Sequence, residues 1–222
     1  MTHAAAAATP PNVSASPSAP AFYVIDDLSA DRHVAQSAIE IAGHSARGFS
    51  GGAQLLDALS GLAPGVFLVD LMMPDVDGAA VLDAVTRRDA GDVVLMMSAH
   101  ADIAAAVGAI RRGAHDFLLK PLDMTEATET LARAVSLFTS RQEAERIEAS
   151  VRDIVTSITP KEMLVLRHLL AGKRNKTIAF ELGVSERTIE VHRARLIKRS
   201  NSGTFAGLIA FAVRAGIAPA ED

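Results

Sequence analysis

Five short apolar runs within residues 21–140 constrain the fold of this chain more than any other feature. Four of the runs are clear, namely Phe22–Ile25, Val66–Val69, Val93–Met97 and Phe117–Leu119. A fifth and weaker run lies within residues 44–50. Each has the length of a buried strand. Helix-like segments lie between and after them, near residues 29–42, 51–60, 78–89, 101–112 and 123–140. Such alternation predicts an α/β fold with a doubly wound, five-stranded parallel sheet.

Charged and polar residues lie at the ends of four of these strands. They are Asp26 and Asp27 after the first strand, Asp70 after the third, Ser98 after the fourth and Lys120 after the fifth. In doubly wound sheets these ends converge on one crevice. Three carboxylates there would repel one another unless a hard cation bound, and Mg²⁺ suits oxygen ligands. A carboxylate can also accept a phosphoryl group, whose charge the cation and the lysine would neutralise.

Each residue of this cluster also has an ordinary structural interpretation. An Asp–Asp pair at a strand end is commonly a turn or a helix cap. The isolated Asp70 and the Lys120–Pro121 pair are both typical of loops. Their coincidence at the ends of the first, third and fifth strands favours a functional cluster over accident.

Four motifs in this region resemble the receiver domain of two-component response regulators. They are VIDD at 24–27, VDLMMPDVDG at 69–78, MMSAH at 96–100 and RRGAHDFLLKP at 111–121. The resemblance covers essentially all of residues 21–140 and implies the flavodoxin-like, CheY-like receiver fold. It implies that a sensor histidine kinase phosphorylates Asp70. It further implies a set of site residues, with Mg²⁺ held by Asp26, Asp27, Asp70 and the backbone carbonyl of Met72, Ser98 as switch hydroxyl, Lys120 as phosphate-binding lysine and Phe117 as aromatic switch.

The same resemblance implies how phosphorylation would reach the surface. Ser98 would move to bond the new phosphoryl oxygens, Phe117 would turn into the vacated space, and the face of the fourth helix and fifth strand would change shape. In this family that face often pairs two receivers. The alternative for Phe117 is a core aromatic, and both roles can hold. Arg111, Arg112 and Asp116 lie in or beside that face, and the alternative for them is surface charge near a helix end.

The C-terminal part of the sequence differs in charge and in periodicity. Residues 21–140 carry 8 Lys and Arg against 16 Asp and Glu, residues 141–156 carry 3 against 4, and residues 157–222 carry 11 against 6. A basic domain suits a polyanionic partner. Helix signals run through it, with a start at Thr159–Pro160, a cap at Asn175, a cap at Ser185 and a last helix near 204–214. This predicts an all-α four-helix domain.

Residues 175–194, NKTIAFELGVSERTIEVHRA, have the spacing of a helix-turn-helix. Ala179 is small where two helices touch, Gly183 supplies a turn with positive φ, and Ile189 packs back on the first helix. The predicted inner face is completed by Ile178, Leu182 and Val184. An ordinary helical hairpin is the alternative, and the basic charge of the domain favours DNA binding.

Helical-wheel geometry assigns the side chains that would read DNA. With Ile189 and Leu196 inward, the outward residues are Arg187, Glu190, Val191, Ala194, Arg195 and Lys198. Such side chains can contact base edges, whereas Lys176, Thr177 and Thr188, at helix starts, suit phosphates. His192 either contacts a phosphate or packs between helices. The expected DNA-binding residues are therefore Lys176, Thr177, Arg187, Thr188, Glu190, Val191, His192, Arg195 and Lys198.

Three stretches of this domain resemble the LuxR/FixJ-type output domain over about residues 157–216. They are ITPKEMLVL, AGKRNKTIA and SERTIEVHRARL, and the EVHRA run is particularly like the FixJ branch. The resemblance implies DNA binding as a dimer, with the last helix contributing to pairing. KRSNSGTF at 198–205 departs from it, being more polar than expected after a recognition helix.

The remaining segments complete the predicted organisation. Residues 1–20 are rich in Ala, Pro, Ser and Thr, lack the features of a signal peptide and predict a disordered leader. A receiver domain over 21–140, a helical linker over 141–156 and the output domain over 157–222 follow. Apolar residues recur at helical spacing through the linker, at Ala144, Ile147, Val151, Ile154 and Ile158. They form either a coiled-coil seam between two protomers or a face packed on its own chain.

These observations together predict a cytoplasmic, phosphorylation-dependent transcriptional regulator rather than an enzyme. The sequence has no cysteine, which excludes disulfides and thiolate chemistry, and no apolar run of membrane-spanning length. A phosphorylation-dependent homodimer would bind double-stranded DNA and contact RNA polymerase. Two alternatives stay open. One is a haloacid-dehalogenase-like phosphatase. Such enzymes place a second Asp two residues after the nucleophile, where this chain has Met72, which counts against this alternative. The other is an orphan regulator whose receiver is never phosphorylated, and the intact cluster counts against it.

Overall fold

The computed structural model describes residues 19–100 and 103–221. It divides the chain into two compact units, Met1–Glu143 and Ala144–Asp222. All but the last two residues of the predicted leader, 1–20, lie outside the described residues, as do the first two residues of the helix predicted over 101–112. None of the described helices has the combination of length and apolar character that crossing a membrane requires.

The N-terminal unit is built on a five-stranded sheet with the order β2-β1-β3-β4-β5. All the neighbouring strands pair in parallel. The strands are β1 Ala21–Ile25, β2 Ala46–Phe49, β3 Gly65–Asp70, β4 Val93–Ser98 and β5 Asp116–Leu119. The predicted doubly wound fold is confirmed, including the weak strand within residues 44–50.

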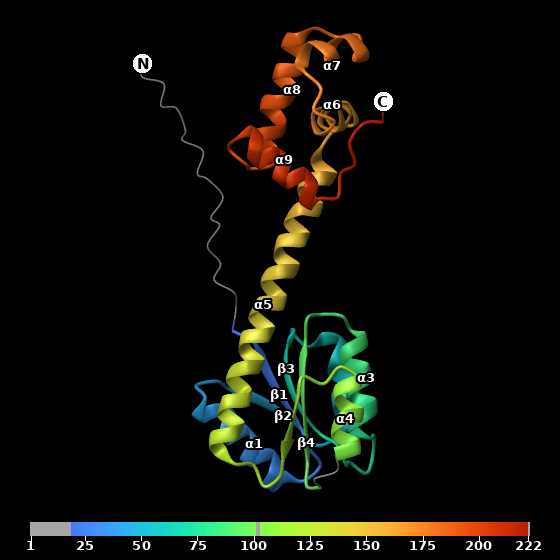
Figure 1. Ribbon diagram of the computed structural model, residues 1–222. Helices are drawn as coiled ribbons and strands as arrows, with labels where there is room; N and C mark the ends of the chain where they lie inside the picture. The colour runs from blue at the N-terminus through green and yellow to red at the C-terminus, as the bar shows by residue number, and fades with distance from the viewer. Residues whose placement is uncertain (1–18, 101–102, 222) are drawn as a thin grey trace, which may run out of the picture. The chain divides into compact units, whose positions relative to one another are not determined.

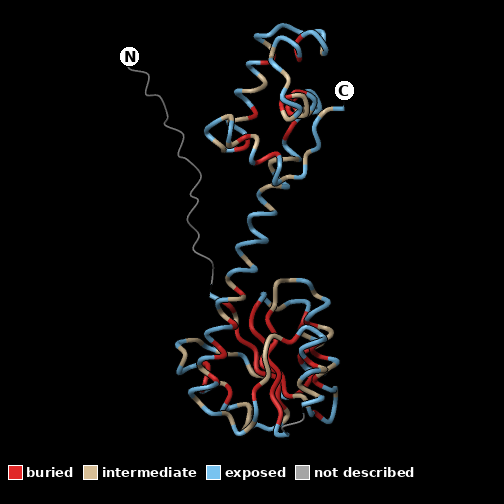
Figure 2. Tube along the Cα trace, viewed as in Figure 1, coloured by how far each residue is buried: buried red, intermediate tan, exposed pale blue. Residues whose placement is uncertain are grey.

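Side chains alternate between the two faces of the sheet, and each face is covered by helices (Figure 1). On β1, Phe22 and Val24 face the core under α1 (Ser29–Ile41) and α5 (Met124–Ser157). Tyr23 and Ile25 face the opposite core. The elements of that second layer are α2 Gly52–Ala58, the 3₁₀ turn η1 Leu59–Gly61, α3 Gly78–Arg87 and α4 Ile103–Arg111. Because both faces are covered, the central strands are buried along their length (Figure 2).

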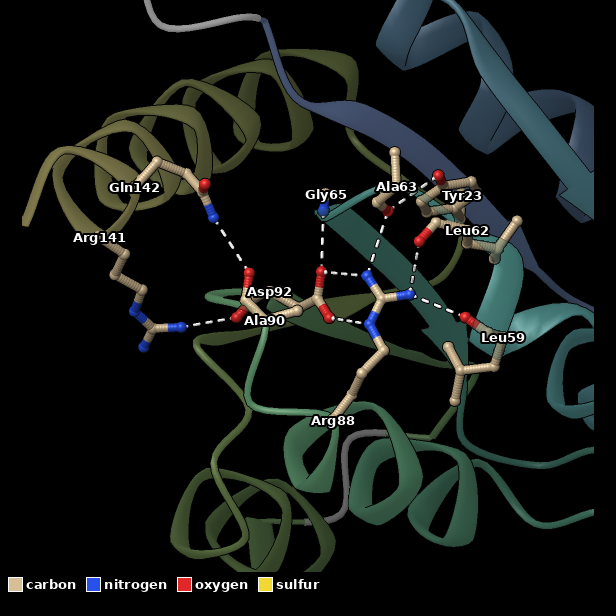
Figure 3. Close-up of polar contacts among 10 residues, drawn as sticks. All are labelled: Tyr23, Leu59, Leu62, Ala63, Gly65, Arg88, Ala90, Asp92, Arg141 and Gln142. Atoms are coloured by element: carbon tan, nitrogen blue, oxygen red, sulfur yellow. Dashed lines mark hydrogen bonds and ion pairs between the residues drawn. The ribbon is translucent and has the colours of Figure 1, made fainter. Parts of the chain in front are cut away.

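One arginine ties together several loops at the amino-end edge of the sheet (Figure 3). The guanidinium of Arg88 donates to the Asp92 carboxylate, with Nε 2.9 Å from Oδ2 and Nη2 3.0 Å from Oδ1. It also donates to the carbonyls of Leu59, Leu62 and Ala63 at 2.8, 2.9 and 3.1 Å. Asp92 in turn accepts from the backbone N–H of Gly65, the first residue of β3, at 2.8 Å. We call these contacts the Arg88 network.

The same edge contacts the part of α5 that belongs to the N-terminal unit. Arg141 donates to the carbonyl of Asp92 at 2.6 Å, and Gln142 donates to the carbonyl of Ala90 at 3.0 Å. These bonds attach α5 to the loop between α3 and β4 (Figure 3). Helix α5 continues to Ser157, so one helix includes both the last predicted receiver helix and the predicted linker.

The C-terminal unit packs four further helices around its own core, as predicted. They are α6 Pro160–Leu170, α7 Asn175–Leu182, α8 Glu186–Arg199 and α9 Phe205–Arg214. Thr159 and Glu162 form a capping box at the start of α6. Ser185 caps α8 by accepting from the Thr188 N–H at 3.2 Å. The cap predicted at Asn175 is wrong, because Asn175 is already the first helical residue and Arg174 holds the N-cap position without a side-chain bond.

The apolar series of the linker divides into two parts. Val151, Ile154 and Ile158 pack against the core of the C-terminal unit, which supports the alternative of a face packed on its own chain. Ala144 and Ile147 are exposed. Within the polar run 198–205, residues 200–204 connect α8 to α9. Asn201 has φ 51° there, Ser200 is buried and bonds Ser202 at 2.9 Å, and Thr204 caps α9.

Candidate functional site

Parallel strand order brings the predicted acidic residues to one edge of the sheet. Asp26 follows β1, Asp70 ends β3, and both are buried, with 0% and 4% of the residue exposed. One carboxylate oxygen each from Asp26, Asp27 and Asp70 lies within 4.8 Å of the others. Ser98, which ends β4, is also buried. The predicted convergence of these side chains is therefore present.

Lys120 provides positive charge at this cluster from the end of β5. Its Nζ lies 2.7 Å from Oδ2 of Asp26 and 3.0 Å from Oδ1 of Asp70. It also lies 3.0 Å from Oδ2 of Asp31, in the first turn of α1. The sequence does not single out Asp31, because an acidic residue in a first turn is ordinary for any helix.

Burial and charge act in opposite directions on these groups. Burial raises the pKa of Asp70, and the hydrogen bond and charge of Lys120 offset only part of that rise. Burial lowers the pKa of Lys120, but hydrogen bonds to Asp26, Asp70 and Asp31 outweigh it and hold that pKa well above its ordinary value. Lys120 is therefore a fixed cation, whereas the Asp70 carboxylate carries a charge that its surroundings do not fully stabilise.

The donor set of this cluster fits Mg²⁺. Carboxylate oxygens are hard ligands of the kind Mg²⁺ prefers. Asp26, Asp27 and Asp70 supply three carboxylates that one lysine does not neutralise. Met72, the fourth predicted ligand, lies in the loop after β3 with its side chain directed outward, since 69% of the residue is exposed. Its role rests on the backbone carbonyl and stays a prediction.

The loop after Asp70 is anchored at several points. Asp75 accepts from the N–H groups of Gly52 and Ala53 at the start of α2, at 3.3 and 2.9 Å, and the bond from Ala53 is the largest cause of its lowered pKa. Glycine is required at 78, because a Cβ there would lie 2.1 Å from the carbonyl oxygen of Asp70. These contacts fix the backbone that carries Asp70.

The predicted switch residues lie on adjacent strands. The Oγ of Ser98 accepts from the His100 N–H at 3.2 Å. Phe117 is half-buried on β5 and packs against the core on the α2–α4 side of the sheet, so the core-aromatic interpretation applies to it in this structure. Two charged residues at the face of α4 and β5 form ion pairs within the chain. Arg112 pairs with Asp83 at 2.8 Å, and Asp116 pairs with Arg133 at 2.9 Å. Arg111 is exposed at the end of α4.

The helix-turn-helix is formed by α7, a turn at Gly183 with φ 65°, and α8. Ile178, Ala179 and Ile189 are buried at the contact of the two helices, as predicted, and Leu182 packs against the same core. Val184 does not join the inner face. It lies in the turn beyond Gly183, where 42% of the residue is exposed.

The predicted outward orientation on α8 is confirmed. The exposed residues there include Arg187, Glu190, Val191, Ala194, Arg195 and Lys198, and Lys176 and Thr177 are exposed in the first turn of α7. Thr188 is half-buried, with its N–H bonded to Ser185. The Nδ1 of His192 is buried, and His192 lies near the buried Glu162. For His192 this favours helix packing over phosphate contact.

Arg193, which sequence analysis also missed, turns away from the outward face. Its guanidinium carbon lies 3.9 Å from the centre of the Phe205 ring. This contact links α8 to α9 by a cation–π interaction.

Two family models match the chain in its two units. The model of the response regulator receiver domain matches residues 22–132. The model of the luxR family of bacterial regulatory proteins matches residues 156–209.

Known proteins resemble nearly the whole chain. The transcriptional regulatory protein FixJ of Azorhizobium caulinodans is 36% identical over 204 residues, 90% of this chain and 95% of the relative. FixJ of Bradyrhizobium diazoefficiens is 34% identical over 196 residues, 88% of this chain and 96% of the relative.

Solved structures agree with these matches. The response regulator StyR superposes with a TM-score of 0.82 at 26% identity, covering 89% of this chain and all of that one. Full-length FixJ from B. japonicum has a TM-score of 0.54 at 35% identity, covering 89% and 97%. The chain therefore belongs to the response regulators that join a receiver domain to a LuxR-type DNA-binding domain.

Proposed function

We propose that Asp70 accepts a phosphoryl group from the phosphohistidine of a sensor histidine kinase, and that this event controls DNA binding by the C-terminal unit. One observation carries the proposal. Asp26, Asp27 and Asp70 meet at the carboxyl-end edge of the sheet, where Lys120 pairs with Asp26 and Asp70, in the same chain as a helix-turn-helix with an exposed basic helix. The two relatives named FixJ are transcriptional regulatory proteins, which supports transcription as the controlled process.

The reaction is a displacement at phosphorus. A carboxylate oxygen of Asp70 forms the new O–P bond while the N–P bond of the phosphohistidine breaks, and the imidazole leaves with the electron pair and takes up a proton. Lys120, held at 3.0 Å from Asp70, donates to the transferred group and offsets its charge. Asp26, Asp27, Asp70 and the Met72 carbonyl would hold Mg²⁺, which would supply further positive charge at the phosphoryl oxygens.

Ser98 and Phe117 convey the new state to the surface in this proposal. The buried Ser98 hydroxyl gives up the His100 N–H and donates to a phosphoryl oxygen. Phe117, half-buried on the neighbouring strand, then repacks toward the vacated space. The shape of the α4–β5 face changes with it, and two phosphorylated chains pair through that face.

A homodimer places two copies of α8 on DNA. The base-reading residues are Arg187, Glu190, Val191, Arg195 and Lys198, and the phosphate contacts are Lys176, Thr177 and Thr188, at two half-sites roughly 10 bp apart. His192 supports α8 through packing. Contact with RNA polymerase near the promoter completes the proposal, which places the protein in the cytoplasm and assigns it no reaction beyond its own phosphorylation and dephosphorylation.

Intact mass measurement of the full chain, after incubation with acetyl phosphate and Mg²⁺, separates this function from its two alternatives. A stable gain of one phosphoryl group, lost in Asp70→Asn and on removal of Mg²⁺, supports the regulator. Rapid release of phosphate without accumulation supports a phosphatase, although the position of its second acid holds the exposed Met72. No labelling, with DNA binding intact, supports an orphan regulator.

A further inference from the structure

We propose that Asp31 is a positioning residue that acts on phosphoryl transfer through Lys120, an inference that rests on the proposed function. The proposal starts from the three carboxylates that surround the side-chain nitrogen of Lys120. Oxygens of Asp26, Asp31 and Asp70 lie 2.7, 3.0 and 3.0 Å from the Lys120 Nζ. An ammonium group has only three N–H donors, so these three oxygens already compete for all of them.

Phosphoryl transfer changes what Lys120 must bind. A phosphoryl oxygen can gain a donor from Lys120 only when one of the three carboxylates gives its donor up. Asp26 and Asp70 belong to the acidic trio that lies within 4.8 Å, whereas Asp31 lies outside that trio. The Asp31 side chain is also 38% exposed, against 0% for Asp26, so water can replace Lys120 as its partner. Asp70 is itself the phosphoryl acceptor. Of the two carboxylates that do not react, Asp31 is therefore the one that competes with the phosphoryl group for Lys120.

The charge of Asp31 acts on two binding events with opposite signs. Its oxygen and that of Asp70 lie 3.0 Å from the same nitrogen, so they lie within twice that distance of each other. A negative charge so close attracts a divalent cation and repels an incoming phosphoryl group. Removing the charge should weaken Mg²⁺ binding and, once Mg²⁺ is saturating, accelerate phosphorylation.

An ordinary structural role predicts something different. An acid in the first turn of α1 stabilises the helix through its dipole. Losing that effect would lower stability and would leave Mg²⁺ affinity and phosphorylation unchanged, or lower both together. Opposite changes in the two quantities are therefore specific to the proposed role.

The test uses Asp31→Asn in the full chain, with Glu40→Gln as control. Glu40 is exposed on the same helix, so its variant loses the same charge away from the cluster. Calorimetric titration gives the Mg²⁺ affinity, and intact mass gives the initial rate with acetyl phosphate at saturating Mg²⁺. In Asp31→Asn the Mg²⁺ dissociation constant should rise roughly three- to tenfold and the rate should rise by a similar factor. Glu40→Gln should match the wild type.

Other outcomes overturn the inference or separate it from the proposed function. Changes of the same sign, or values like those of Glu40→Gln, overturn it. Asp31→Ser, a second variant without the charge, must show the same pair of changes; if it does not, the inference fails even when Asp31→Asn folds poorly. If wild-type protein gains no phosphoryl group on Asp70, the proposed function itself fails.

Discussion

Replacing Arg88 with methionine should destabilise the N-terminal unit by about 3 kcal/mol. The Arg88 side chain is 16% exposed and that of Asp92 only 3%, so the substitution leaves a buried carboxylate without its cation. Breaking a buried pair costs about 3–5 kcal/mol. Three carbonyls also lose the Arg88 donor, although that of Ala63 keeps the Tyr23 hydroxyl and that of Leu59 keeps the Leu62 N–H. Methionine keeps the packing of the aliphatic stem, and Asp92 keeps the Gly65 N–H, which places the cost at the lower end.

The chain contains its own probe for this measurement. Tyr23 is the one tyrosine in the sequence, which has no tryptophan, and its hydroxyl donates to the Ala63 carbonyl within reach of the Arg88 network. Tyrosine fluorescence during a urea titration of the full chain therefore reports unfolding of the N-terminal unit. Arg87→Met, which removes the exposed neighbouring arginine, is the matched control. A difference below about 1 kcal/mol between the two variants would refute the reasoning, because it lies under the smallest cost of breaking a buried pair.

Three further predictions concern other parts of the chain. Asp70→Asn should stabilise the Mg²⁺-free N-terminal unit at neutral pH, because burial raises the pKa of Asp70 and its ionisation therefore costs stability. The variant should raise the urea midpoint measured by tyrosine fluorescence, and this increase should shrink as the pH falls below the pKa of Asp70. Thr159→Ala should lower the free energy of unfolding of the C-terminal unit by about 1 kcal/mol, because it removes the capping box with Glu162. Circular dichroism follows the unfolding of this helical unit, and an unchanged unfolding transition would contradict the prediction. Arg195→Ala should weaken duplex binding in gel shifts and reduce the salt slope by about 1 if it contacts phosphate, whereas unchanged affinity removes it from the DNA-binding residues.

The acidic cluster was predictable from sequence because it follows from strand order. Once β1, β3 and β5 are recognised as parallel, Asp26, Asp70 and Lys120 must reach the same edge of the sheet. The outward residues of α8 were predictable for a similar reason, since a helix has one period and Ile189 fixes which side is inward.

The interactions that sequence analysis missed join residues whose spacing carries no signal. Asp31 reaches Lys120 across 89 positions, because only folding brings the first turn of α1 within ion-pair distance of the Lys120 side chain. The Arg88 network depends on loop carbonyls, which any residue supplies. Local turn geometry accounts for the two errors at 175 and 184. Arg174 rather than Asn175 has the extended backbone of an N-cap, and the turn at Gly183 leaves Val184 outside the core.

The affinity of the full chain for duplex DNA, with and without phosphorylation, tests the central claim most directly. Duplexes selected from a random-sequence pool by the acetyl phosphate-treated protein would supply the site. Wild-type protein should bind it more tightly after treatment with acetyl phosphate and Mg²⁺, and Asp70→Asn should show the same weak binding before and after. Equal affinity of treated and untreated wild-type protein, with Asp70 shown by mass to be phosphorylated, would contradict the account.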